Sequence, residues 1–291
     1  MILPILLTFM LTTTDPSGSP QIQEPPAVVL DDIVVTAPNR AAVEAFVDIL
    51  TDSGPRGGNR GQIARWGEPI CLRIIGGPHA DNERLRAAVG DVFASLNIRS
   101  DRPACRPNVM VVIADDADGF ARAISSRSRN RFFQNRRQIQ AEFVAASAPV
   151  RWEHRTRVGA AGRSPLIDER VTRTSGEPIE LPNSRITQST SERIERAMIV
   201  VNARRIAQLP LDSLAAYIAF VTLVDAPMGA NIAERTSILN LFETPGIVSD
   251  GLSDWDRAFI ESLYSIQTDV LFPMQRLELE QRMARALDAT D

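Results

Sequence analysis

Pro69–Ile75 (PICLRII) and Asn108–Ile113 (NVMVVI) are the two stretches that decide the fold. Both are apolar runs of strand length, and the second is apolar almost throughout, which is typical of a strand buried on both faces. Between them, Asn82–Leu96 carries apolar residues at helical spacing. A strand, a helix and a second strand in this order predict a parallel pair joined by a right-handed crossover.

The two cysteines of the chain flank this unit, because Cys71 lies in the first strand and Cys105 just before the second. If the strands are neighbours, the two thiols can bridge, and closing a loop of that size adds about 3–4 kcal/mol in the chain-entropy model. The alternative is two unrelated buried thiols. A disulfide at Cys71 and Cys105 favours an oxidising compartment.

Further elements follow on both sides of the unit. The patterns predict helices near residues 39–50, 119–125 and 138–146, a polar β-hairpin within 149–175, a loop at 176–192, a strand at Ala197–Val201, an apolar helix at Leu211–Val224, and helices at 236–243, 253–265 and Met274–Leu287. These elements predict one α+β or α/β domain over residues 31–291, with its core at about 62–268.

The first 30 residues predict a signal-like segment followed by a flexible leader. Ile2–Leu11 is an apolar run too short to span a bilayer, and Thr12–Pro26 is rich in Thr, Ser, Pro and Gln. The run departs from a standard secretory signal because no basic residue precedes it and no clear cleavage site follows it. No later segment approaches 18 uncharged apolar residues, so we expect a periplasmic or secreted protein without a transmembrane span in its mature chain.

Composition removes several kinds of chemistry. All 32 basic side chains among the 291 residues are arginine, so lysine Schiff bases and the P-loop lysine are excluded. With two histidines and two cysteines, a histidine-rich metal site and a four-thiolate zinc site are excluded as well. The chain also has no G-x-S-x-G motif.

The two histidines are the weak candidates for a metal site. His79 follows a Gly-Gly-Pro turn, with Asp81 and Glu83 after it, and His154 stands between Glu153 and Arg155 on a predicted strand. Both also fit solvated side chains, and no ligand spacing connects them. We therefore expect no cofactor, with zinc only as an alternative that requires both rings in one cleft.

A basic stretch is the candidate for binding an anionic surface. It contains Arg127, Arg129, Arg131, Arg136 and Arg137, interleaved with Phe132 and Phe133. Arginine with aromatic residues suits an anionic lipid surface or single-stranded nucleic acid. The acidic residues Asp115, Asp116 and Asp118 just upstream favour instead a solvated helix face or an intramolecular charge match. The net charge of −4 leads us to expect no nucleic-acid partner.

From about Trp66 onward, the chain resembles uncharacterised exported proteins of alphaproteobacteria. The resemblance rests on Ala64–Cys71 (ARWGEPIC), Cys105–Val109 (CRPNV), Leu214–Ala219 (LAAYIA), Ser237–Phe242 (SILNLF) and Ser253–Ala258 (SDWDRA). It implies export and brings no established activity.

The C-terminal half is also similar to zincin-type putative metallopeptidases. In that group a central helix carries the metal-binding His or Glu residues, whereas here Leu211–Val221 (LDSLAAYIAFV) offers only Asp212. The resemblance therefore implies a relative without the metal-binding motif. We expect a non-catalytic cell-envelope protein that acts through protein or surface contacts, with an envelope protein as a possible partner. A zincin-like metallohydrolase with an atypical or degenerate site is the alternative.

Overall fold

The strand–helix–strand unit forms the start of the sheet. Strands β2 (Leu72–Ile75) and β3 (Val109–Ala114) are parallel and pair from Leu72 opposite Val109 to Ile75 opposite Val112. Helix α2 (His79–Ser95) connects them. This computed structural model describes residues 40–51, 62–100, 105–126, 137–160, 188–230, 232, 236–243 and 250–289. The predicted leader at 1–30 lies outside these residues.

Strand β5 (Thr190–Asn202) organises the sheet, because three strands pair with it. Strand β1 (Arg65–Trp66) and β3 run parallel to it, one after the other along its length. Strand β4 (Val150–Ala160) runs antiparallel to it. The described strands thus form one mixed, mainly parallel five-stranded sheet, which with its helices gives the predicted α/β class.

The predicted hairpin within 149–175 does not include the strand with which β4 pairs in the described sheet. The first strand is present as β4, but its partner is β5, which includes residues 190–192 of the predicted loop. Local alternation cannot identify this partner, because pairing between distant strands is decided by what the whole sheet buries. Residues 161–187, between the two strands, lie outside the described part.

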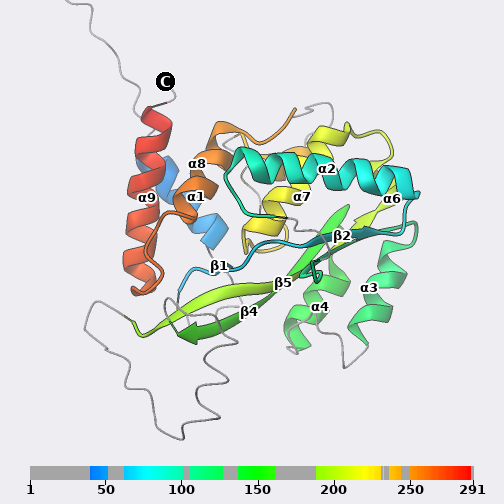
Figure 1. Cartoon of the computed structure of the whole chain (residues 1–291), viewed down its shortest axis with the longest axis horizontal. Coiled ribbons are helices and arrows are strands. Elements are labelled where there is room, and N and C mark those ends of the chain that lie inside the picture. Colours follow the sequence, from blue (N-terminus) through cyan, green and yellow to red (C-terminus); the bar gives the residue numbers. More distant parts are fainter. Residues whose placement is uncertain are drawn as a thin grey trace, which may run out of the picture. The chain divides into compact units, whose positions relative to one another are not determined.

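Helices cover both faces of the sheet (Figure 1). Helices α2 and α7 (Leu211–Leu223) lie on one face, and α3 (Ala117–Ser125) and α4 (Arg137–Ala145) on the other. Successive strand residues therefore enter different cores, since side chains alternate along a strand. Val111 and Ile199 belong to the larger cluster, whereas Val112, Met198 and Val200 belong to a smaller one with α3 and α4.

Three helices gather beside the sheet: α1 (Arg40–Thr51), α8 (Asp254–Leu263) and α9 (Phe272–Asp288). Phe46 of α1 packs against α8, because its ring lies 5.4 Å from that of Trp255 and 5.9 Å from that of Phe259. The remaining short elements are α6 (Ala203–Ile206) and the 3₁₀ helix η2 (Ile238–Phe242), which occupies the predicted 236–243 segment.

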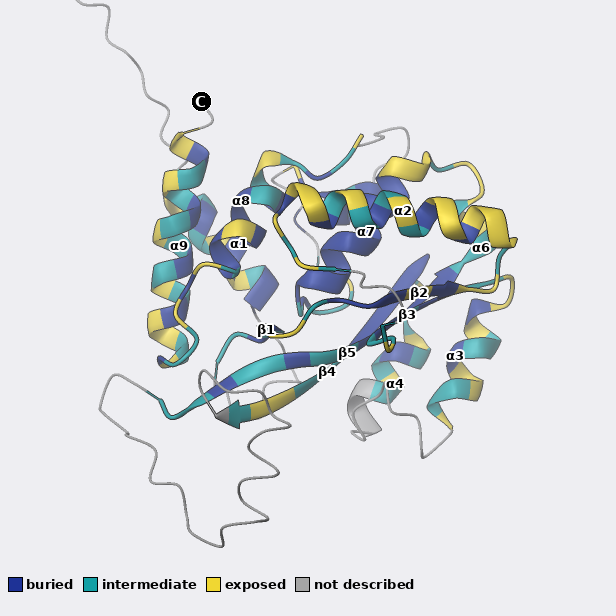
Figure 2. Ribbon diagram, viewed as in Figure 1, coloured by how far each residue is buried: buried dark blue, intermediate teal, exposed yellow. Residues whose placement is uncertain are grey.

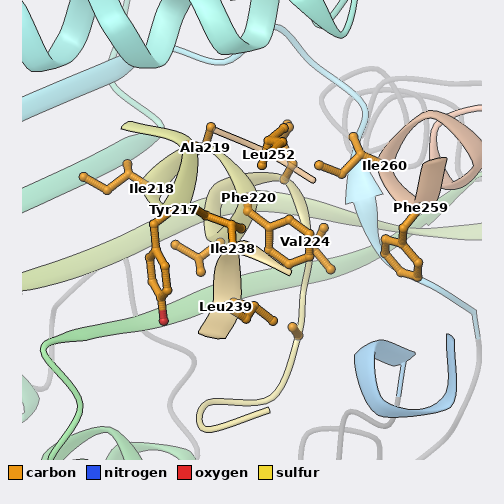
Figure 3. Packing of buried hydrophobic residues seen from close by; sticks show 14 of the residues in the cluster. Tyr217, Ile218, Ala219, Phe220, Val224, Ile238, Leu239, Leu252, Phe259 and Ile260 are labelled. Atoms are coloured by element: carbon orange, nitrogen blue, oxygen red, sulfur yellow. The ribbon is translucent and has the colours of Figure 1, made fainter. Parts of the chain in front are cut away.

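Helix α7 is the centre of the larger core. Every residue from Ser213 to Leu223 is buried, which Figure 2 shows as a continuous dark-blue helix. Its Tyr217 and Phe220 lie beside Ile238 and Leu239 of η2 in the larger cluster (Figure 3). No helix within the described ranges is both long enough and apolar enough to cross a membrane.

Candidate functional site

A disulfide joins the entrances of the two parallel strands. Cys71 immediately precedes β2, and Cys105 lies four residues before β3, with their Cα atoms 6.0 Å apart. Adjacency of β2 and β3 brings the two residues together, so the predicted pairing of the cysteines is confirmed.

The side chain of Asn108 provides a second tie at the same place. Its Oδ1 accepts a hydrogen bond of 2.7 Å from the backbone N–H of Cys71, and its Nδ2 donates one of 3.1 Å to the carbonyl of Pro69. The short segment from Cys105 to Asn108 is therefore held covalently at one end and by hydrogen bonds at the other. Arg106 lies between the two ties.

A cleft of about 510 Å³ opens beside the disulfide. Its described lining comes from the segments before β2 and β3 and from β4 and β5: Trp66, Gly67, Glu68, Pro69, Ile70, Cys71, Cys105, Arg106, Pro107, Asn108, Arg155, Arg157, Arg193, Ile194, Glu195 and Arg196. The cleft therefore lies at the amino ends of β2 and β3 and just after β1, whereas open α/β sheets usually bind ligands at the carboxyl ends of the strands.

Arginine dominates this lining. Five arginines, Arg106, Arg155, Arg157, Arg193 and Arg196, stand against two glutamates, Glu68 and Glu195, among the described lining residues. The cleft is thus a positively charged hollow in a chain whose net charge is −4. A guanidinium group stays protonated in proteins and binds carboxylate or phosphate through two parallel hydrogen bonds.

A β-bulge places the arginines of β5 together. Residues three apart in a regular strand point to opposite faces, yet Arg193 and Arg196 both line the cleft. The pairing of β4 with β5 shifts at this point, because Arg155 lies opposite Arg196 whereas Thr156 lies opposite Ile194. Glu195 is the extra residue in β5. Bulges re-aim side chains in this way and are frequent beside functional sites.

The bulge also produces two cross-strand pairs of like charge. Arg155 lies directly opposite Arg196, and Arg157 lies directly opposite Arg193. Like charges at directly opposed positions destabilise a sheet. Glu195 offsets part of this repulsion, because its carboxylate lies 3.6 Å from the Arg155 Nε and 3.2 Å from the Arg157 Nη1.

A second hollow of about 370 Å³ adjoins the cleft and shares Trp66, Gly67 and Glu68 with it. The shared wall is rigid, since the indole Nε1 of Trp66 donates a 2.7 Å hydrogen bond to the carbonyl of Thr222. Tyr264 lines the second hollow and donates its hydroxyl to the carbonyl of Leu223 at 3.1 Å. Burial raises the pKa of the Tyr264 phenol, which therefore stays neutral at physiological pH.

Gly67 gives a specific test of the arginine arrangement. A Cβ atom added at this position would lie 2.8 Å from Cδ of Arg193, a flexible part of that side chain. We expect Gly67→Ala to move the Arg193 guanidinium with a stability loss of less than about 1 kcal/mol, because an arginine can adopt another rotamer. Chemical denaturation measures the stability, and the Arg193 Nε–Hε signal in an NMR spectrum reports the movement. An unchanged Arg193 signal would contradict the expectation.

The structure does not bring the two candidate histidines together. His79 is exposed at the first residue of α2, whereas His154 is buried in β4. Strands β3 and β5 lie between the strand that precedes α2 and β4, which is about 14 Å at the usual strand spacing. In the described ranges, no group of three or more His, Cys, Asp or Glu side chains could hold a metal ion.

His154 instead links β4 to the end of α7. Its Nδ1 lies 3.0 Å from a carboxylate oxygen of Asp225, and its Nε2 lies 3.3 Å from the carbonyl oxygen of Thr222. Trp152, two residues earlier on the same strand, donates its indole N–H to the carbonyl of Ala226. The two side chains together fasten β4 to the segment that follows α7.

The other candidates from the sequence have different outcomes. Arg127, Arg129, Arg131 and Arg136 lie outside the described residues, as does the side chain of Arg137, the first residue of α4. In the zincin-like segment, Asp212 is exposed at the start of α7, and the rest of the helix packs in the core.

Sequence reasoning missed the arginines of the cleft. Arg155 and Arg157 alternate on a predicted strand, which places both on one face and was a usable signal. Arg193 and Arg196 gave no such signal, because their spacing indicates opposite faces unless the bulge is known.

Comparisons with known proteins add no assignment. No family model matches the sequence, and neither curated proteins nor solved structures gave a significant match. The resemblances noted from the sequence are therefore neither supported nor opposed by them.

Proposed function

We propose that this chain is an exported bacterial protein of the periplasm or the extracellular space that works by binding and not by catalysis. Its binding surface is the arginine-lined cleft. The observation that carries the proposal is the Cys71–Cys105 disulfide in the wall of this positively charged cleft.

The disulfide supports an oxidising compartment. Structural disulfides persist in secreted and periplasmic proteins and are rare in the bacterial cytosol, where thiols are kept reduced. Cys71 is also 5% exposed, so the bond lies mostly inside the fold and fixes the strand entrances. The apolar run at the start of the sequence agrees with export.

The chemistry of the cleft supports binding. Guanidinium groups bind anions firmly and stay protonated near neutral pH. They can therefore orient and neutralise a ligand, but they cannot serve as general bases. Histidine commonly supplies proton transfer, and neither His79 nor His154 is among the described residues that line the cleft. An acidic group on a partner is the complement to such a surface.

Thiol trapping in fractionated cells tests the proposed compartment. We expect the full-length protein to appear in the periplasmic or extracellular fraction with neither cysteine alkylated unless a reductant is added first, because the disulfide forms only after export. Mass spectrometry of the alkylated protein counts the labelled cysteines. A protein confined to the cytosol with two labelled cysteines would refute export.

Site-directed crosslinking tests the proposed surface. A photoreactive amino acid at Glu68, on the exposed rim of the cleft, should yield an adduct in intact cells. The same amino acid at Arg84, an exposed position on α2 away from the cleft, is the matched control. Equal labelling from both positions would count against the cleft as the contact surface.

A further inference from the structure

We infer that the arginine-lined cleft is a receptor site for a small ligand that carries at least two anionic oxygen groups, either carboxylates or phosphates. The inference rests on the proposed function and specifies the chemistry of its ligand.

The like-charge pairs across β4 and β5 are the first argument. Two successive pairs, Arg155 with Arg196 and Arg157 with Arg193, place four arginine side chains on the cleft side of the β4–β5 pair. An arrangement that costs stability persists at a functional position when a bound partner relieves it. The described lining of the cleft as a whole carries five arginines and two glutamates, Glu68 and Glu195, so a ligand with at least two negative charges is the matching complement.

The position of Arg106 is the second argument. This exposed residue lines the cleft from a different segment of the chain, the one tied by the disulfide and by Asn108. A group on a segment that is already held in place binds more tightly, because the chain loses less conformational freedom on binding. Arginines from β4, β5 and this segment therefore surround an anion from more than one direction.

The shape of the cleft selects a small ligand over a membrane surface. A volume of about 510 Å³ falls within the range of small-molecule sites. Ile70, Ile194 and Pro107 add apolar area between the charged groups, which suits a ligand with a carbon skeleton. A flat bilayer cannot bring its headgroups into a hollow of this kind, whose charged groups come from β4, β5 and the segment before β3.

Thermal unfolding and calorimetric titration of the oxidised full-length protein test the inference. The probes are citrate for carboxylates, pyrophosphate for phosphates, and sodium chloride at equal ionic strength. We expect saturable binding of citrate or pyrophosphate and a rise in Tm beyond that in sodium chloride, because a ligand that binds only the folded state stabilises it. Whichever probe binds more tightly identifies the source of the anionic groups.

Arg193→Gln separates a binding role from a structural one. It should weaken binding of the probe about tenfold or more, because a charge-assisted contact is lost, while leaving the Tm of the unliganded protein nearly unchanged, because the loss of the hydrogen bond from Arg193 to Ser191 is offset by the loss of the repulsion with Arg157. Arg84→Gln, at an exposed arginine on α2, should change neither. A lower unliganded Tm with unchanged probe affinity would overturn the inference.

The outcomes distinguish this inference from the proposed function. If neither citrate nor pyrophosphate binds beyond the effect of sodium chloride, or if only vesicles of anionic phospholipid bind, the small-ligand inference fails. Crosslinking from Glu68 with correct export would then still support the proposed function. If the protein stays in the cytosol but binds citrate or pyrophosphate saturably, the proposed export fails and the anion site stands. The two failures can therefore be told apart.

Discussion

Replacing both Cys71 and Cys105 with alanine should lower the free energy of unfolding by about 3–4 kcal/mol. The two cysteines are separated by 34 residues, and without the bond the unfolded chain regains the conformational freedom of that loop. The corresponding fall in Tm is roughly 10 °C for a domain of this size. Urea denaturation monitored by tryptophan fluorescence measures the change in the free energy of unfolding.

A reductant supplies the matched control. Dithiothreitol should destabilise the wild-type protein by the same amount and leave the double variant unaffected. We expect the reduced wild-type protein and the double variant to remain folded. The hydrogen bonds of Asn108 and the pairing of β2 with β3 persist without the disulfide. A wild-type unfolding curve that does not respond to reductant would show that the bond adds no stability.

The disulfide could be predicted from local sequence patterns. The β2–α2–β3 unit was predictable because each element has a clear period, and a helix of that length between two apolar strands has few other arrangements. Once the strands are neighbours, the positions of Cys71 and Cys105 follow. The predicted disulfide therefore depended on contacts within one short stretch of sequence.

Pairing over a longer range was not predictable in the same way. β4 reads as a strand from the alternation of Val150, Trp152 and His154, but nothing local indicates that its partner begins at Thr190. The partner of β4 depends on which strand completes the buried sheet. β5 is that strand, because it forms backbone hydrogen bonds with β1, β3 and β4 together. The predicted hairpin did not include β5, because this competition involves the whole sheet.

The candidate site depends on two features that a sequence hides. One is the bulge at Glu195, which brings Arg193 and Arg196 to the same side. The other is that β1 ends where β3 begins along β5, so that the cleft lies between segments far apart in the chain. The prominent cluster at residues 127–137 drew attention because it is contiguous, whereas the arginines of the cleft become neighbours only through strand register.

Asp256→Ala should have the largest effect of any single substitution considered, a loss of about 3–5 kcal/mol in the free energy of unfolding. The fully buried carboxylate of Asp256 accepts hydrogen bonds from Ser237 Oγ at 2.7 Å, Ile238 N at 2.8 Å and Ser253 N at 3.0 Å. Burial raises the pKa of this carboxyl, while the donated hydrogen bonds oppose the rise. Removing it leaves those donors buried without an acceptor. Urea denaturation measures the loss.

The size of this effect follows from what Asp256 connects. With Ser253 it forms the capping box of α8, and through Ser237 it ties that helix to η2, which packs on α7. Asp254→Ala is the matched control, because Asp254 is exposed in the same helical turn and should cost about 0.5 kcal/mol through the helix dipole alone. Asp256→Asn should give an intermediate loss and keeps the test possible if the alanine variant does not fold. If Asp256→Ala and Asp254→Ala unfold at the same urea concentration, the carboxylate does not hold α8 to η2.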